Sequence, residues 1–182
     1  FEAVVKNLPS GVHKLSVLVD NSFSEASALH VENDYQSYGG ISRGVMIEQL
    51  PKHYIKQLHF TPVCKDDTWY AQLELVIASL DGKPWKGKVS VSLKGCDDVN
   101  ENVLYTQSCS TGAGELVLKS DLIACENAKP WAPEHPTLYV LSAHLEDEDG
   151  KVIDDLIDRV GFREVRTQGK DILLNGKKLQ IK

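Results

Sequence analysis

The sequence has no long apolar run. Its hydrophobic stretches are only a few residues long, whereas a membrane-spanning helix needs about 20. The N-terminus lacks the charged and apolar regions of a secretory signal peptide. The 20 Lys and Arg are outnumbered by 26 Asp and Glu and form no basic stripe, so the net charge of −6 argues against a nucleic-acid partner. We therefore expect no membrane and no nucleic-acid partner, and a cytoplasmic location.

The sequence also lacks the short motifs of self-contained catalytic and metal sites. Its four cysteines form no CxxC pair, and its six histidines have neither zinc spacing nor an HExxH setting. A GxSxG nucleophile motif and a phosphate-binding glycine loop are absent too. A chain of 182 residues is long enough to form a hydrophobic core without disulfides, so reduced thiols are expected rather than two disulfides. We predict no catalytic residue, no metal site and no cofactor.

What the sequence does contain is alternation of apolar and polar residues with a period of two. Residues 69–77 place five apolar side chains on one face, and 89–93 and 139–145 repeat the pattern. Several runs are closed by pairs that favour tight hairpins: Asp81-Gly82, Asp149-Gly150 and Asn175-Gly176. The pattern predicts an all-β protein, with Trp69 and Trp131 as large core residues.

The spacing of the runs predicts an immunoglobulin-like β-sandwich over residues 51–164. The best boundary is the Leu50-Pro51 step, between one alternating run and the next. The segment 1–50 holds only three or four predicted strands, one of them over 15–19. It needs further strands or a neighbouring domain to cover its apolar face. Both ends of the chain lie within predicted strands, so we expect a fragment of a larger protein.

Acidic residues cluster at three places. The run from Glu146 to Gly150 is the richest, but a calcium loop of the DxDxDG type needs an acidic residue at position 145, which is Leu. A solvated hairpin tip is predicted there instead. Asp97-Asp98 and Asp154-Asp155 are adjacent pairs whose side chains would point to opposite faces of a strand, so neither suits an acid/base couple.

The segment from Lys129 to Pro136 holds three prolines around Trp131. An exposed aromatic ring can stack on a sugar face, which leaves a carbohydrate-binding interpretation open. The structural interpretation is favoured, because prolines hold an extended approach from which Trp131 can plug the end of the sandwich.

Five short motifs occur in a recognisable order. They are Phe1-Glu2-Ala3, the run Tyr38–Val45 (YGGISRGV), Trp131-x-Pro133-x-x-Pro136, Val160–Arg163 (VGFR) and Ile172–Lys177 (ILLNGK). Together they resemble the β-galactosidase/β-glucuronidase family of glycoside hydrolases, family 2, over essentially the whole chain. Phe1-Glu2-Ala3 leans towards glucuronidases, and Tyr38–Ile41 leans towards galactosidases.

The resemblance implies three parts. Residues 1–50 would be the C-terminal part of a jelly-roll, galactose-binding-like domain, and 51–164 the immunoglobulin-like sandwich. Residues 165–182 would be the hairpin that leads to a TIM barrel absent from this chain. The family hydrolyses β-glycosides with retention, using two glutamates of the barrel. No catalytic residue is therefore expected here, and the isolated chain should be inactive.

The resemblance also implies a substrate-binding residue in the intact parent protein. In the family, an aspartate six residues before the glycine of the Gly-Ile-x-Arg motif hydrogen-bonds the bound sugar, and counting back from Gly40 reaches Asp34. The competing interpretation of Asp34 is a turn or cap residue. The implied partners are a β-galactoside or β-glucuronide substrate, the protein's own TIM barrel and a possible second copy in a homo-oligomer. The alternative function is a free-standing carbohydrate-binding or adhesion module.

Overall fold

The computed structural model describes residues 2–20, 22, 39–96, 100–112 and 114–180. The chain divides into two compact units, Phe1–Gln49 and Leu50–Lys182. Among the residues described, no helix has the length and apolar character that crossing a bilayer requires.

The first unit contains no strand in its described residues. The strand predicted over 15–19 is therefore not formed, and Leu15 and Val17 are 68% and 43% exposed. A strand is held by backbone hydrogen bonds to a neighbour and by burial of alternate side chains, and the described part of this unit supplies neither.

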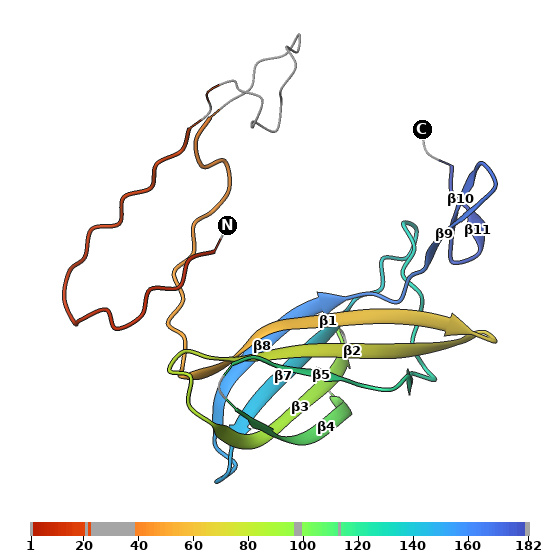
Figure 1. Cartoon of the computed structure of the whole chain (residues 1–182). Coiled ribbons are helices and arrows are strands. Elements are labelled where there is room, and N and C mark those ends of the chain that lie inside the picture. Colours follow the sequence, from red (N-terminus) through yellow and green to blue (C-terminus); the bar gives the residue numbers. More distant parts are fainter. Residues whose placement is uncertain (1, 21, 23–38, 97–99, 113, 181–182) are drawn as a thin grey trace. The chain divides into compact units, whose positions relative to one another are not determined.

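The second unit is all-β, as predicted. Its strands are β1 (His53–Lys65), β2 (Thr68–Ser79), β3 (Trp85–Gly95), β4 (Asn102–Thr111), β5 (Leu116–Lys119), β6 (Ile123–Ala124), β7 (Tyr139–Asp147), β8 (Val152–Val160), β9 (Val165–Gln168), β10 (Asp171–Leu174) and β11 (Lys177–Lys178). Figure 1 shows the long strands β1, β2, β3, β4, β7 and β8 stacked as a sandwich, together with the short β5.

The sandwich consists of two antiparallel sheets. One has the order β1-β2-β5, with β6 also paired to β2, and the other has the order β4-β3-β7-β8. Strands β1 and β8, the edges of different sheets, meet where the Ile55 amide donates to Asp154 Oδ2 at 2.7 Å. The architecture is the predicted immunoglobulin-like sandwich.

The core lies between the two sheets and follows the predicted alternation. On β2, Trp69 and the four apolar residues that follow on the same face are all buried. The facing residues on β3 and β7, Val89, Val91, Leu141, Ala143 and Leu145, are at most 1% exposed. At roughly 25 cal/mol per Å² of apolar surface, this burial is the main stabilising contribution.

The aromatic part of the core is centred on Phe162, not on Trp131. Phe162 is fully buried, and its ring lies 5.3 Å from those of Phe60 and Tyr139 and 5.8 Å from that of Trp69. Trp131 is only half-buried. The prediction of Trp131 as a core residue is therefore wrong in part, because an isolated aromatic in a proline-rich segment has no strand to carry it between the sheets.

The last described residues form a small separate sheet of order β11-β10-β9. A single hairpin was predicted over 165–182, and the structure adds a strand, since Asp171 pairs with Gln168 and Leu174 with Lys177. Asn175 and Gly176, which form the second turn, have φ values of 50° and 74°. Positive φ at both central residues is the requirement of a type I′ turn and explains the Asn-Gly pair.

Candidate functional site

Asp34, the residue predicted to contact a sugar, lies outside the described residues, so its role stays a prediction. The nearby Gly40 is described and has φ of 104°, a conformation that residues with a Cβ rarely adopt. Gly40 therefore has a backbone conformation that suits a sharp turn.

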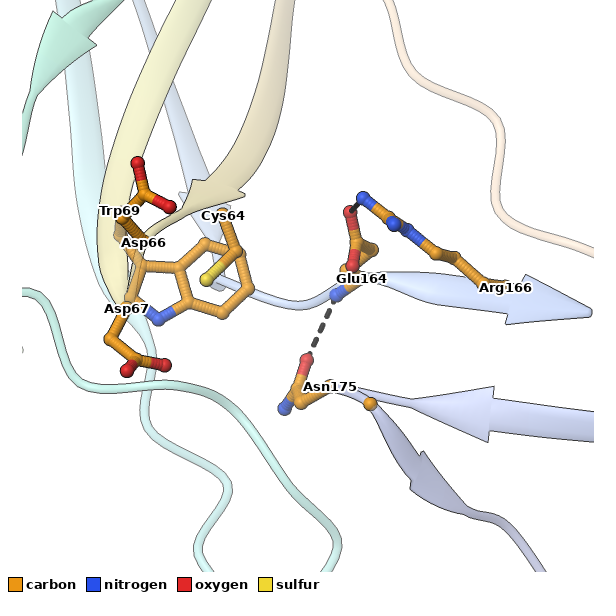
Figure 2. A pocket seen from close by; sticks show the side chains of 8 residues that line it. Cys64, Asp66, Asp67, Trp69, Glu164, Arg166 and Asn175 are labelled. Atoms are coloured by element: carbon orange, nitrogen blue, oxygen red, sulfur yellow. Dashed lines mark hydrogen bonds and ion pairs between the residues drawn. The ribbon is translucent and has the colours of Figure 1, made fainter.

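A recess of about 330 Å³ lies at one end of the sandwich. Figure 2 shows that it has two walls, one from the β1–β2 hairpin and one from the segment around β9 and the β10–β11 turn. Its lining residues are Cys64, Asp66, Asp67, Trp69, Glu164, Arg166, Asn175 and Gly176.

The first wall is held in a strained conformation. Asp66 and Asp67 form the two-residue turn between β1 and β2, because Lys65 pairs directly with Thr68. Their φ values are 48° and 59°, so both adopt the left-handed conformation of a type I′ turn without glycine. The left-handed conformation costs about 1–2 kcal/mol for a residue with a Cβ, although Asp tolerates it better than most.

The second wall is held by Asn175. Its Oδ1 accepts the Glu164 amide at 2.9 Å, and its backbone N–H donates to the Glu164 carbonyl at 2.8 Å. Its Nδ2 donates to the Trp131 carbonyl at 2.9 Å. The Glu164 carboxylate in turn forms an ion pair with Arg166. One amide side chain thus fixes both the small sheet and the proline-rich segment to the end of the sandwich.

The proline-rich segment is anchored at the same place. The Trp131 amide donates to the Phe162 carbonyl at 2.8 Å, and Pro130 and Phe162 form a parallel bridge. The Arg163 guanidinium lies 5.1 Å from the centre of the Trp131 ring, within cation–π range. Since Arg163 occupies one face of this ring, the structural interpretation of Trp131 is favoured over sugar stacking. Three of the five sequence motifs therefore meet at one junction.

The described thiol and carboxyl groups with shifted pKa values are not poised for catalysis. Burial raises the pKa of the Cys109 and Cys125 thiols, which disfavours the nucleophilic thiolate. A hydrogen bond from Lys119 lowers the pKa of Glu74, and the Lys83 amide lowers that of Asp81. A general-acid carboxyl needs a shift in the opposite direction. The four cysteines are free thiols.

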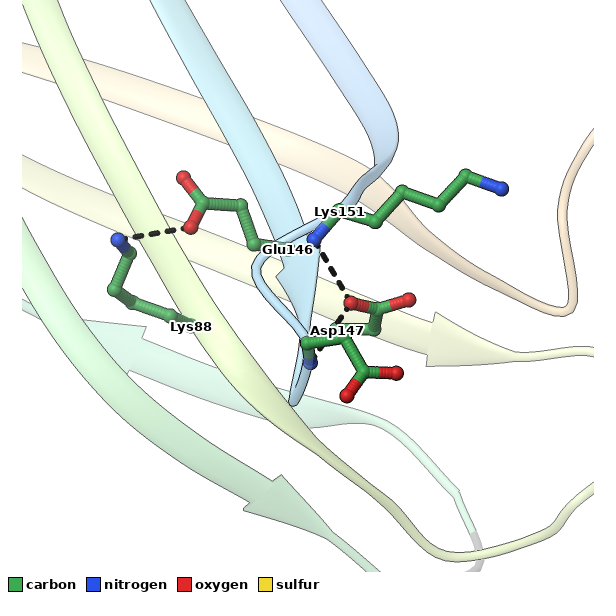
Figure 3. Close-up of polar contacts among 5 residues, drawn as sticks. Lys88, Glu146, Asp147 and Lys151 are labelled. Atoms are coloured by element: carbon green, nitrogen blue, oxygen red, sulfur yellow. Dashed lines mark hydrogen bonds and ion pairs between the residues drawn. The ribbon is translucent and has the colours of Figure 1, made fainter.

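The acidic run from Glu146 to Gly150 is the tip of the β7–β8 hairpin, as predicted. Figure 3 shows two of its carboxylates engaged by the protein: Glu146 pairs with Lys88 at 2.8 Å, and Asp147 Oδ1 accepts the amides of Asp149 and Lys151 at 3.1 and 2.9 Å. Within the described part of the chain, no group of three or more His, Cys, Asp or Glu side chains is placed to hold a metal ion.

The structure tests the prediction for only one of the two adjacent aspartate pairs, Asp154-Asp155. Asp154 binds the backbone of β1 through the Ile55 amide, and Asp155 is exposed, so the two side chains do not act together. Asp97 and Asp98 lie outside the described residues.

Sequence reasoning missed the lining of the recess. Asp66, Asp67, Glu164 and Arg166 were not singled out, because none belongs to a catalytic or metal-binding motif. A usable signal existed for Asp66-Asp67, since this pair is flanked by apolar runs on both sides and therefore marks a tight hairpin.

Residues 53–163 match the model of the family described as glycosyl hydrolases family 2. The match covers more than half of the chain. The chain belongs to this family. The region includes both sheets of the sandwich and the Phe162 junction, so the resemblance inferred from the five motifs is confirmed.

Individual relatives agree with this assignment. A family 2 β-galacturonidase from Eisenbergiella tayi, solved with galacturonate, is 46% identical with a TM-score of 0.78 and covers 90% of this chain. A β-galactosidase from Streptococcus thermophilus is 30% identical over 96% of this chain. A β-glucuronidase from Ruminococcus gnavus, solved with D-glucuronic acid, is 21% identical over 73% of this chain with a TM-score of 0.55, which shows the shared fold alone.

These relatives are much longer than the chain. It spans 28% of the Eisenbergiella enzyme, 20% of the Ruminococcus enzyme and between 16% and 21% of the curated relatives it matches. The family 2 region described above is thus a small part of each of these proteins.

Proposed function

We propose that this chain is a non-catalytic region of a retaining β-glycosidase that hydrolyses β-hexuronides, with β-galacturonides as the preferred class. The observation that carries the proposal is the 46% identity to the Eisenbergiella β-galacturonidase over 90% of the chain. The other relatives named above, at 30% and 21% identity, are a β-galactosidase and a β-glucuronidase.

A galacturonide shares chemical features with both substrates indicated by the sequence motifs, a glucuronide and a galactoside. Like a glucuronide, it carries a carboxylate at C6, and like a galactoside, it has an axial hydroxyl at C4. A parent enzyme for this sugar would need a cationic or hydrogen-bonding group for the carboxylate and an acceptor for the hydroxyls. Asp34 is our candidate acceptor, since an ionised carboxylate can hold two neighbouring hydroxyls.

The two catalytic carboxyl groups of a retaining glycosidase lie about 5 Å apart, and one of them needs a raised pKa to act as the acid. The described carboxyls with shifted pKa values are shifted downwards, and Glu164 is engaged by Arg166. We therefore assign the hydrolysis to a TIM barrel of the parent protein. The sandwich supports that barrel, and the junction of Phe162, Trp131 and Asn175 fixes the small sheet that leads towards it.

The test is a comparison of substrates on the complete protein expressed from the encoding gene. We expect kcat/KM for a 4-nitrophenyl β-galacturonide to exceed that for the β-galactoside by at least about a hundredfold, because a site built for a carboxylate leaves polar groups unpaired with the neutral sugar. The β-glucuronide should lie between them. A preference for the neutral galactoside would refute the uronide assignment.

Asp34→Asn in the same protein tests the sugar contact. The amide keeps the size of the side chain but replaces one acceptor oxygen with a donor, so kcat/KM should fall at least about tenfold while the unfolding temperature stays the same. Equal loss of activity and of folding would instead support the turn or cap interpretation of Asp34.

A further inference from the structure

The sandwich has four edge strands, β1 and β5 in one sheet and β4 and β8 in the other. An edge strand presents unpaired backbone N–H and C=O groups, which can pair with another chain. Folded proteins commonly prevent such pairing with charges, prolines, bulges or short strands.

Three of the four edges carry these protections. Strand β1 contains Pro62 and has a register shift at Lys56, and the Ile55 amide is held by Asp154 of β8. Strand β5 has only four residues and ends on Lys119. Strand β8 carries four charged side chains in nine residues: Asp154, Asp155, Asp158 and Arg159.

Strand β4 is different. Its ten residues, NVLYTQSCST, include no charged residue and no proline. A register shift against β3 falls near its start, at Leu104, and leaves the seven residues Tyr105–Thr111 in regular antiparallel pairing with Val91–Trp85. Among the described residues no strand pairs with its other side.

The side chains of Tyr105–Thr111 alternate between the two faces of the sheet, although Gln107, on the same face as Tyr105 and Cys109, is exposed. Tyr105, Cys109 and Thr111 face the core, and Thr106, Ser108 and Ser110 are exposed on the outer face of the sheet. The segment is thus seven residues long, extended and electrically neutral, in a chain whose net charge is −6.

We propose that Tyr105–Thr111 is the self-association edge of this protein, and that it pairs antiparallel with the same segment of a second copy about a two-fold axis at Ser108. In an antiparallel pair, directly opposite residues share one face of the sheet. A two-fold axis at Ser108 places Tyr105 opposite Thr111 and Gln107 opposite Cys109, so side chains on the same face of the sheet lie opposite each other across the interface. This register is also the one that pairs all seven residues.

The neutrality of the segment favours a second copy as the partner. Two molecules of the same net charge repel, and like charges placed directly opposite in a sheet destabilise it. Self-pairing is therefore least opposed at an edge without charges. The pairing would join two four-stranded sheets into one eight-stranded sheet with closed inner edges.

The experiment uses charge reversal at the two-fold axis. Ser108→Lys and Ser108→Glu each place like charges opposite each other, whereas an equimolar mixture of the two variants places opposite charges there. By sedimentation equilibrium we expect a concentration-dependent dimer for the unmodified chain and a dimerisation midpoint at about fivefold higher concentration for each variant alone. The mixture should recover the midpoint of the unmodified chain.

The control is Gln72→Lys, which adds the same charge as Ser108→Lys to an exposed position of β2 in the other sheet. It should leave the dimerisation midpoint unchanged.

Hydrogen exchange provides the second measurement. The amides of Tyr105–Thr111 should become more protected as the concentration of the unmodified chain rises, and this gain should disappear in Ser108→Lys. A chain that stays monomeric at millimolar concentration would overturn the proposal. So would a dimer that persists in Ser108→Lys, or one that forms without protection of β4.

Discussion

Two buried hydroxyl groups of the sandwich have opposite energetic roles. Ser120 Oγ accepts the Leu73 amide at 2.9 Å and donates to the Asp121 carbonyl at 2.7 Å. Thr111 Oγ1 is buried and has no hydrogen-bond partner among the described residues. A paired buried hydroxyl stabilises the fold, and an unpaired one carries the full desolvation cost.

We therefore predict opposite signs for two conservative substitutions. Thr111→Val should raise the free energy of unfolding by about 1 kcal/mol, and Ser120→Ala should lower it by about 1–2 kcal/mol, because the second leaves the Leu73 amide unpaired. Urea unfolding of both variants measures the two values. Destabilisation by Thr111→Val of the same size as by Ser120→Ala would contradict this account.

The strained turn at Asp66-Asp67 offers a second test at the level of single residues. Both aspartates adopt positive φ, whereas the equivalent β10–β11 turn uses Asn-Gly for the same conformation. Asp67→Gly relieves the left-handed strain and should stabilise the chain by up to about 1 kcal/mol. The matched control is Gly176→Asp, which introduces that strain into the other turn and should destabilise by a similar amount. Urea midpoints that do not move in opposite directions would show that the turns are not strained as described.

At the scale of elements, one carboxylate hydrogen-bonds across the contact between β1 and β8. Asp154 accepts the part-buried Ile55 amide at the register shift of β1, and its neighbour Asp155 points to solvent. Asp154→Ala should lower the free energy of unfolding by about 1–3 kcal/mol through the unpaired amide. Asp155→Ala should change it by less than about 0.5 kcal/mol. The expected signature is faster hydrogen exchange at Ile55 in the Asp154 variant only; equal effects of the two substitutions would refute the contact.

The elements that could be predicted from the sequence are those marked by a local, repeating pattern of apolar residues. Residues 69–77 alternate strictly, and the strand β2 buries the face that the alternation indicated. The central position of Phe162 could not be predicted from periodicity, because its burial depends on Phe60, Trp69 and Tyr139, which come from three distant strands. The turn at Asp66-Asp67 was missed because it lacks the glycine present in the three predicted hairpin turns.

The strand predicted over 15–19 is absent for a different reason. Alternation shows only that a segment could bury one face, and a strand also needs a hydrogen-bonded neighbour. Leu15 and Val17 remain exposed in the structure. The candidate sugar contact at Asp34 came from the family motif alone, since a lone aspartate beside two glycines has no distinguishing property in composition or spacing.

At the scale of the whole molecule, the carboxyl groups set the response to acid. The hydrogen bond from Lys119 holds the pKa of Glu74 below its ordinary value of 4.5, and Asp81 is lowered by the Lys83 amide. A carboxyl whose pKa is lowered by folding contributes its full stabilisation above the ordinary pKa and loses it as the pH falls through the folded value. Stability should therefore be nearly constant from pH 7 to about pH 5 and should fall below about pH 4.5.

Replacement of Glu74 isolates one contribution to that fall. Glu74→Gln removes the ionisable group, so the difference in urea midpoint between pH 7 and pH 3 should be smaller than in the unmodified chain. In 1 M salt the two proteins should differ less, since the exposed Glu74–Lys119 pair is screened. An identical pH dependence in the two proteins at low salt would contradict the assignment.

The central proposal is that this family 2 chain supports a catalytic domain of a longer parent protein and does not itself cleave glycosides. The measurement that tests it most directly is turnover of 4-nitrophenyl β-galacturonide, β-glucuronide and β-galactoside by the purified 182-residue chain, beside the complete protein as a positive control. We predict release of nitrophenol by the complete protein and none above the buffer rate by the chain. Turnover by the chain would contradict the proposal, and its loss in Glu164→Gln would place a catalytic carboxylate in the recess.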